Sequence, residues 1–314
     1  MSDNLTVGNL TAESGTKVQG YLEVVNCEIK MPVTLINSAN PGKTVLITGG
    51  MHGGEYPGIE TGIRLSSMLN PQDISGRLII VHVVNTPAFF AKLQYVGPYD
   101  GKNLNREYPG IATGTISQKI AYTVSSQMFT KADFYIDLHS GDIHEKLTSF
   151  VFYSLLSTPE KIELSKQAAT LAGFPYVVGS LNPVGALGGA AQMGIPGLLI
   201  ENGNCGLWSE EDVENSLSGI QNILRFLEVL PGKAKNLCDV EFFKKTVNEN
   251  ARDTGCWYPF VTIGDLVKEG QKLGEIKNLF GQILSEYFAI RDGRVLYHTS
   301  SLAINVGDPL IAYA

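Results

Sequence analysis

A buried strand followed by a glycine-rich turn and a helix constrains the fold of this chain most. Residues 43–48 (KTVLIT) are apolar and β-branched, which is typical of a strand inside a sheet, and residues 59–69 carry apolar positions at helical spacing. The turn between them (GGMHGGEYPG) contains His52 and Glu55. Open α/β sheets bind their ligands at strand-to-helix connections. This order of elements favours an α/β fold with a functional site at the turn.

His52 and Glu55 are candidate metal ligands. Zinc binds imidazole nitrogen and carboxylate oxygen, and catalytic zinc sites use three protein ligands plus water. The glycines allow positive φ, so both side chains can turn toward one centre without helical geometry. A His-x-x-Glu pair alone is a weak signal, because a helix cap or an ordinary hydrogen bond uses the same residue types. A third ligand must come from elsewhere in the chain.

Two further strands end in polar residues. His139 ends an apolar run (DFYIDLH) and is the predicted third ligand, with Asp137 on the same side of the strand. Asp137 could accept a proton from a histidine ligand, or it could be a solvated carboxylate. Glu201 ends a second apolar run (GLLIE). Because ionised groups are seldom buried unpaired, Glu201 either points to solvent or has a functional role.

A polar loop at residues 100–110 carries Asn105 next to Arg106. An amide beside a guanidinium is suited to gripping a carboxylate, which arginine binds with a planar fork of donors.

Taken in order, these four segments resemble the succinylglutamate desuccinylase/aspartoacylase family, a branch of the zinc carboxypeptidase superfamily. The resemblance covers most of residues 40–230. It implies that His52, Glu55 and His139 hold one Zn²⁺ per chain and that Glu201 is the general acid/base. The implied reaction is hydrolysis of the amide bond of an N-acyl amino acid or similar small carboxylate by zinc-activated water.

The resemblance also implies that Asn105 and Arg106 bind the substrate carboxylate. Family members usually carry an arginine upstream of this pair, which steadies the carbonyl oxygen during attack, but here the corresponding residue is Gln94. Gln94 brings no charge, and Lys92 is an alternative source. Losing one oxyanion donor costs on the order of 10²–10³ in turnover. Either the zinc polarises the carbonyl more strongly, the substrate differs from the usual ones, or activity is low.

Two other functions would use the same residues. A metallocarboxypeptidase acting on peptide C-termini needs the same metal, glutamate and Asn-Arg pair, and differs in how open the cleft is. A non-catalytic zinc- or ligand-binding homologue is the other alternative, because Gln94 lacks the charge of the usual arginine.

The composition limits the partners. A formal charge of −7, from 24 basic and 31 acidic residues, argues against nucleic-acid binding, and an acidic substrate would need a locally positive pocket. The N-terminus lacks a secretory signal pattern, and no apolar stretch approaches the roughly 18 residues of a membrane span. Four scattered cysteines fit reduced thiols. We expect a cytoplasmic protein with no membrane contact and a small-molecule substrate; a homo-oligomer stays open.

Three parts follow along the chain: an N-terminal β segment (1–38) packed on the catalytic domain, a zinc hydrolase catalytic domain (39–235) and a C-terminal β domain (236–314). In the second part strands and helices alternate, which predicts a mostly parallel sheet with helices on both faces, similar to the zinc carboxypeptidases. The glycine-rich run 185–191 is interpreted as close packing or a pocket wall. The predicted helices after the first are 117–128, 159–171 and 210–227.

The third part consists of short apolar runs separated by Gly-Asp turns, and it resembles the barrel-sandwich hybrid of lipoyl and biotinyl carrier domains. Lys277 lacks the flanking residues of a modified carrier lysine. By analogy with the family, we expect a lid or wall over the zinc pocket instead of a carrier.

Overall fold

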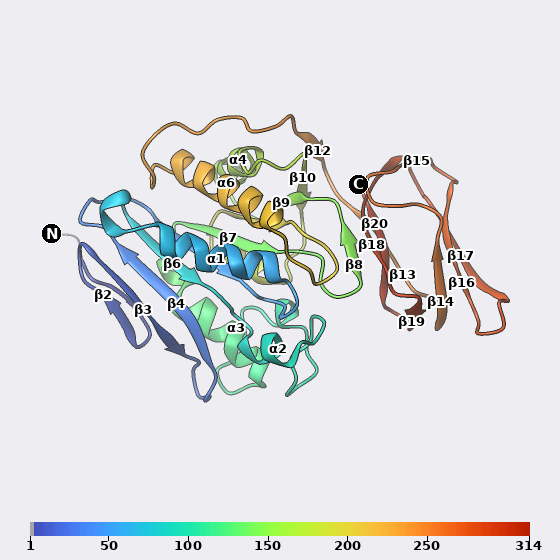
Figure 1. Cartoon of the computed structure of the whole chain (residues 1–314), viewed down its shortest axis with the longest axis horizontal. Helices are drawn as coiled ribbons and strands as arrows, with labels where there is room; N and C mark the ends of the chain where they lie inside the picture. The colour runs from blue at the N-terminus through green and yellow to red at the C-terminus, as the bar shows by residue number, and fades with distance from the viewer. Residues whose placement is uncertain (1–2) are drawn as a thin grey trace.

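The computed structural model describes residues 3–314, and its largest element is a nine-stranded sheet (Figure 1). The pairs β12–β10, β10–β9, β11–β7, β7–β5 and β5–β6 are parallel and the other three are antiparallel, so the sheet is mostly parallel, as predicted. In spatial order the strands are β12 (Glu241–Phe243), β10 (Tyr176–Ser180), β9 (Phe150–Ser154), β11 (Gly197–Glu201), β7 (Phe134–His139), β5 (Thr44–Gly49), β6 (Arg77–Val81), β4 (Lys30–Asn37) and β3 (Thr16–Glu23).

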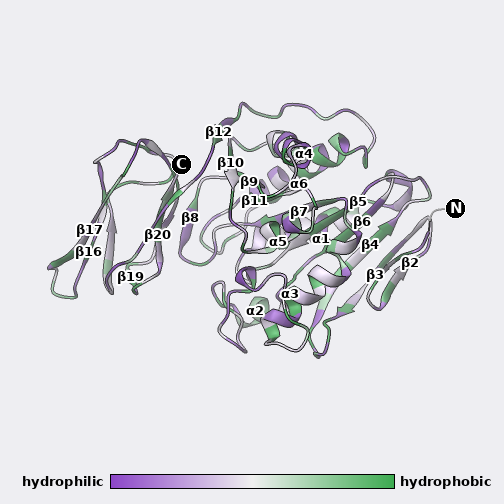
Figure 2. Cartoon of the chain, turned by 180° about the vertical axis from the view of Figure 1, so that it is seen from behind, coloured by the Kyte–Doolittle hydropathy of each residue, from purple (hydrophilic) through white to green (hydrophobic). Residues whose placement is uncertain are grey.

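Helices cover both faces of this sheet, which also confirms the prediction. Along β5, Val45 and Ile47 pack into the core under α1 (Tyr56–Met68), α4 (Pro159–Thr170) and α6 (Glu210–Phe226). Leu46 points the other way, into the core under α3 (Ile116–Gln127) and α5 (Ala186–Gln192), which Figure 2 shows on the opposite side. A strand covered on both faces is apolar at every position, which explains the continuous apolar runs.

The three helices predicted after the first begin and end within one residue of their predicted bounds. Their starts are encoded locally: Thr115 forms a capping box with Gln118, Pro159 occupies the first turn of α4, and the Ser209 side chain accepts a hydrogen bond from Asp212 N.

Two short helices were not predicted, α2 (Thr86–Ala91) and α5. The glycine-rich α5 forms although each glycine costs about 1 kcal/mol in a helix, because it packs tightly. A Cβ atom at Gly188 would lie 2.6 Å from Asn182 O. The single-turn helices are η1 (Pro71–Asp73), η2 (Leu104–Arg106) and η3 (Phe129–Lys131), and β1 (Leu5–Val7) pairs with β2 (Leu10–Ala12).

The C-terminal part is the predicted all-β domain, built from two antiparallel sheets around an apolar core that includes Trp257, Leu273 and Tyr313. One sheet has the order β13 (Val247–Asn250), β20 (Pro309–Tyr313), β18 (Gly293–Thr299) and β15 (Leu266–Val267). The other has the order β17 (Ile283–Phe288), β16 (Lys272–Lys277), β14 (Gly255–Pro259) and β19 (Ala303–Ile304).

A short strand joins the two parts. β8 (Glu145–Leu147) follows β7 in the chain, yet it pairs with β18 of the C-terminal domain (Figure 1). The C-terminal domain is therefore attached next to the carboxyl end of β7. The three-part division of the chain stays a prediction. Among residues 3–314, no helix has the length and apolar character needed to span a membrane.

Candidate active site

The turn after β5 holds its shape through close backbone packing. Of its glycines, only Gly50 has a positive φ, of 66°. A Cβ atom at Gly53 would lie 2.3 Å from Ala88 C, and one at Gly54 would lie 2.0 Å from Asp142 Oδ1. The expected use of positive φ is therefore found at Gly50. Gly53 and Gly54 are glycines for another reason, because neighbouring groups occupy the space that a side chain would need.

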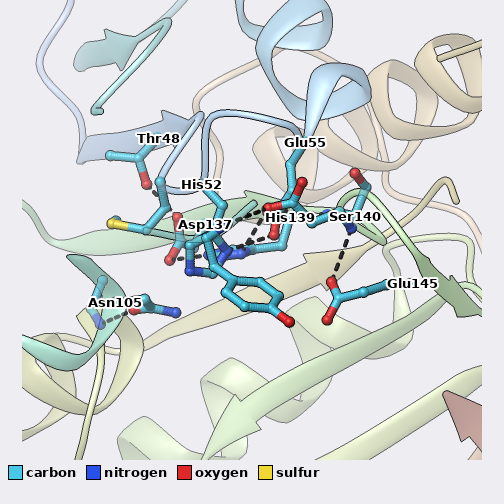
Figure 3. Close-up of polar contacts among 12 residues, drawn as sticks. Thr48, His52, Glu55, Asn105, Asp137, His139, Ser140 and Glu145 are labelled. Carbon is cyan, nitrogen blue, oxygen red and sulfur yellow. Dashed lines mark hydrogen bonds and ion pairs between the residues drawn. The ribbon is translucent and has the colours of Figure 1, made fainter. Parts of the chain in front are cut away.

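The structure brings the three predicted metal ligands together. His52 Nδ1 lies 2.6 Å from Glu55 Oε1, and His139 Nδ1 lies 2.9 Å from Glu55 Oε2. One ligand atom from each residue lies within 4.8 Å of the others, and all three side chains are buried (Figure 3). In residues 3–314, no lysine or arginine forms an ion pair with Glu55. Two imidazole nitrogens and one carboxylate converging without a competing cation form a donor set that fits zinc.

The outer nitrogen of each imidazole has its own partner. His139 Nε2 lies 3.1 Å from Asp137 Oδ2, as predicted from side-chain alternation, and Thr48 Oγ1 donates to Asp137 Oδ1 at 2.7 Å. His52 Nε2 lies 3.0 Å from Asn103 Oδ1. Sequence reasoning missed Asn103, although it lies two residues before Asn105 in the same polar loop. Such partners fix ring orientation and the nitrogen that faces the centre.

The three side chains shift one another's ionisation. Burial alone would lower the pKa of His52 and His139. Glu55 together with Asn103 raises the pKa of His52, and Glu55 together with Asp137 raises that of His139, so both lie above the ordinary value. Burial alone would raise the pKa of Glu55, and the two imidazoles instead hold it well below its ordinary value. The cluster therefore stabilises negative charge on Glu55, which is the form that binds a cation.

Glu201 lies beside the cluster on the neighbouring strand. β11 runs parallel to β7, and Glu201 is directly opposite His139 in the register. Adjacent strands are about 4.8 Å apart, so the two strand ends present their side chains at one edge of the sheet. In residues 3–314, the Glu201 side chain accepts no hydrogen bond. Burial, with the nearby charges of Glu55, Glu145 and Asp137, raises its pKa well above the ordinary value.

Asn105 and Arg106 lie on η2. Asn105, labelled in Figure 3, contacts the start of α5 at Ala186. Asn105 is buried, and its Oδ1 accepts a hydrogen bond from Ala186 N at 2.8 Å. Because the amide oxygen is occupied, the amide nitrogen remains as a donor for a bound carboxylate. Arg106 is exposed, and its Nη1 donates to Asn105 O at 3.0 Å.

Lys92 and Gln94 follow α2 and lie outside the cluster. Lys92 is exposed and caps the C-terminus of α2, and Gln94 is partly buried. Within residues 3–314, neither side chain makes a hydrogen bond or ion pair. The residue of this segment that contacts the cluster is Tyr95, whose ring lies edge-to-face to the His52 ring at 6.3 Å between centroids.

Comparisons with known proteins agree on one family. The pattern of the succinylglutamate desuccinylase/aspartoacylase catalytic domain matches residues 41–227. The chain is 30% identical over 295 residues to an N-alpha-acetyl-L-2,4-diaminobutyric acid deacetylase of Halomonas elongata, covering 91% of this chain and 86% of that protein.

Solved structures give the same result. The product-bound ectoine utilization protein of Ruegeria pomeroyi is 26% identical, with a TM-score of 0.88 over 100% of this chain and 99% of that one. A succinylglutamate desuccinylase/aspartoacylase from Rhodobacter sphaeroides is also 26% identical, with a TM-score of 0.84 over 95% of both chains.

Proposed function

Because the chain belongs to the succinylglutamate desuccinylase/aspartoacylase family, we propose that it is a zinc-dependent deacylase. Its substrate would be an N-acyl amino acid or a similar small carboxylate, cleaved at the amide bond. The observation that carries this proposal is the position of Glu201, opposite His139 in a parallel pair of strands and next to the His52–Glu55–His139 cluster.

His52, Glu55 and His139 would hold one Zn²⁺. When bound, zinc polarises a carbonyl and lowers the pKa of water toward roughly 7. Asp137 and Asn103 would fix the two imidazoles through their outer nitrogens.

Glu201 would move the proton during hydrolysis. A carboxylate at this position takes a proton from the attacking water and delivers it to the leaving amine nitrogen. Its raised pKa means that Glu201 holds a proton more tightly than an ordinary glutamate does, which favours taking the proton from water.

The substrate carboxylate would bind at Asn105 and Arg106. The free amide nitrogen of Asn105 and the exposed guanidinium of Arg106 offer hydrogen-bond donors, and holding the carboxylate there would position the scissile carbonyl near the His52–Glu55–His139 cluster. Gln94 or Lys92 would donate to the carbonyl oxygen during attack.

A substrate panel tests this function. Zinc-loaded protein is assayed against N-acyl amino acids, with N-alpha-acetyl-L-2,4-diaminobutyrate as the first compound because the Halomonas elongata relative is named for it, and against short peptides. We expect deacylation to be faster than removal of a C-terminal residue. Faster peptide trimming would favour a metallocarboxypeptidase, and carboxylate binding without any hydrolysis would favour a non-catalytic homologue.

Glu201→Gln separates catalysis from metal binding. We expect this variant to bind zinc as the wild type does and to lose turnover, and hydrolysis at the wild-type rate would remove Glu201 from the mechanism. A cytoplasmic location and a homo-oligomeric state stay predictions.

A further inference from the structure

A chain of three hydrogen bonds and one ring contact connects the C-terminal domain with the His52–Glu55–His139 cluster. Tyr297 Oη donates to Glu145 Oε1 at 3.0 Å, and Asp142 N donates to Glu145 Oε2 at 3.0 Å. Tyr95 N donates to Asp142 Oδ2 at 2.8 Å, and the Tyr95 ring packs against His52. We call these four residues, Tyr297, Glu145, Asp142 and Tyr95, the Tyr297 relay. The proposed mechanism gives none of them a role.

The backbone around the relay is fixed to the same domain. β8 and β18 pair antiparallel, with Thr299 opposite Glu145. Ser300 N donates to His144 O at 2.7 Å. The loop between His139 and β8 therefore carries Asp142 and Glu145 as part of an attachment to the C-terminal domain, and Figure 3 shows Glu145 beside the cluster residues.

Tyr95 has a backbone conformation that needs support. Its φ is 33°, on the sparsely populated side of the map for a residue with a side chain. Such conformations are strained and persist only where neighbouring contacts hold them. The Asp142 carboxylate supplies such a contact by accepting the Tyr95 N–H.

Asp142 is itself held from several sides. It is fully buried, its Oδ1 accepts from Ile143 N at 2.6 Å, and it lies against the backbone of Gly54 in the metal-binding turn. Its own N–H goes to Glu145. The orientation of the Glu145 carboxylate therefore affects the position of Asp142. Tyr297 donates to Glu145 Oε1, and Asp142 N donates to the other oxygen, Oε2.

The electrostatics point the same way. Burial, followed by the charge of Glu55, raises the pKa of Glu145 to about 7, and the Tyr297 hydroxyl opposes this rise. Removing the Tyr297 hydroxyl takes away a hydrogen-bond donor that favours the charged form of Glu145. In this form both carboxylate oxygens accept hydrogen bonds, one from Tyr297 and one from Asp142 N.

We propose that Tyr297, on the C-terminal domain, is a positioning residue of the candidate active site: it orients Glu145 and, through Asp142, keeps Tyr95 packed against His52. The effect on turnover rests on the proposed function, while the effect on the structure of the 92–97 segment does not. The C-terminal domain thereby contributes to the geometry of the metal-binding turn.

The test compares Tyr297→Phe with Tyr313→Phe in the full-length protein. Tyr313 is a matched control, because its hydroxyl accepts a hydrogen bond from Ile290 N within the same domain and outside the relay. Hydrogen exchange of residues 92–97 is the first readout. We expect the Tyr95 amide to exchange about tenfold faster in Tyr297→Phe, since a lost hydrogen bond to a charged group is worth about 1.5 kcal/mol, and to be unchanged in Tyr313→Phe.

Variants of Glu145 give a second, independent arm. Glu145→Ala breaks the relay and should accelerate exchange at Tyr95 as Tyr297→Phe does. Glu145→Gln should restore wild-type exchange, because its amide can accept from Asp142 N and donate to the Tyr297 oxygen. This arm tests the relay even where Tyr297→Phe folds poorly.

Catalysis is the third readout. Once a compound that the protein deacylates has been identified, we expect kcat/KM to fall about tenfold in Tyr297→Phe and in Glu145→Ala. The double variant should lose no more kcat/KM than either single variant. Unchanged exchange at Tyr95 in Tyr297→Phe, or the same acceleration in Tyr313→Phe, would overturn the inference. Faster exchange in a protein that hydrolyses nothing would support the relay and refute the proposed function instead.

Discussion

Asn103 Oδ1 lies 3.0 Å from His52 Nε2, while the other ring nitrogen of His52 lies 2.6 Å from Glu55 Oε1. Asn105 N donates to the same Asn103 oxygen at 2.9 Å, which identifies that atom as the acceptor end of the amide. An acceptor there requires a proton on His52 Nε2, so in the neutral ring Nδ1 carries the lone pair that a metal needs.

Replacing Asn103 should therefore weaken metal binding without removing a ligand. We expect Asn103→Ala to lower the zinc affinity about 10–100-fold, the usual effect of losing the partner of a ligating histidine, and Asn103→Asp to retain most of it. Competition with a chromophoric chelator measures this affinity. Asn85→Ala, which removes the N-cap of α2 nearby, is the control, and an equal loss there would show that Asn103 acts only through the fold.

Gly54 should not tolerate a side chain. Its added Cβ would lie 2.0 Å from the buried Asp142 carboxylate, and overpacking of this kind costs about 1–3 kcal/mol. We expect Gly54→Ala to lower the thermal midpoint and the zinc affinity together. Gly62→Ala, in α1, is the matched control: its Cβ would meet no atom nearer than 3.7 Å, so it should be neutral or stabilising. A stable, zinc-binding Gly54→Ala would contradict this packing.

Arg106 should act on substrate binding. Hydrogen bonds to charged groups are worth about 1.5–3 kcal/mol, so Arg106→Ala should lower kcat/KM by about 10–100-fold, mainly through KM. Arg106→Lys should recover part of this loss, because lysine keeps the charge but not the planar fork. Steady-state kinetics on an N-acyl amino acid measure both variants. A fall in kcat at constant KM would place Arg106 elsewhere in the mechanism.

Glu145 should make stability depend on pH. Burial, followed by the charge of Glu55, raises its pKa from the ordinary 4.5 to about 7 in the folded chain. The folded state thus holds this proton more tightly than the unfolded state, and the stability it contributes below pH 4.5 is lost as pH rises through about 7. Glu145→Gln removes this titration.

Metal-free protein is suited to the measurement, because a cation on Glu55 would offset its charge. We expect denaturant unfolding to show Glu145→Gln gaining about 2–3 kcal/mol on the wild type between pH 4.5 and pH 8. The exposed Glu269→Gln controls for loss of a surface charge. A constant difference between wild type and Glu145→Gln over this range would argue against the shifted pKa.

The sequence predicted those parts of the candidate site that depend on the alternation of side chains along a strand and on the order of strands and helices in the chain. His139 and Glu201 end apolar runs, and carboxyl ends of parallel strands meet at one edge of a sheet, so their proximity followed from the fold class. The side-chain alternation that placed Asp137 beside His139 is likewise local. The starts of the predicted helices are likewise local, since they lie at capping residues or at a proline.

Other contacts could not be predicted because they depend on how loops pack. Asn103 reaches His52 across 51 positions, and Tyr297 reaches Glu145 across 152, with no periodic pattern to relate either pair. The sequence around Gly53 and Gly54 does not show whether a glycine is needed for close packing against neighbouring groups or for a positive φ. Strand β12 (Glu241–Phe243) follows the predicted catalytic domain in the chain, yet it pairs with β10 in the large sheet. A strand of three residues is too short for its pairing partner to be predicted from the sequence.

Zinc stoichiometry tests the central claim most directly. Titration of metal-free protein with zinc, followed by metal analysis after gel filtration, should give one zinc per wild-type chain and essentially none per chain of a folded His139→Ala variant. Glu201→Gln should retain one zinc, because Glu201 lies beside the cluster and outside its ligand set. A wild-type protein that retains no zinc, or a His139→Ala variant that binds it as tightly as the wild type, would contradict the account.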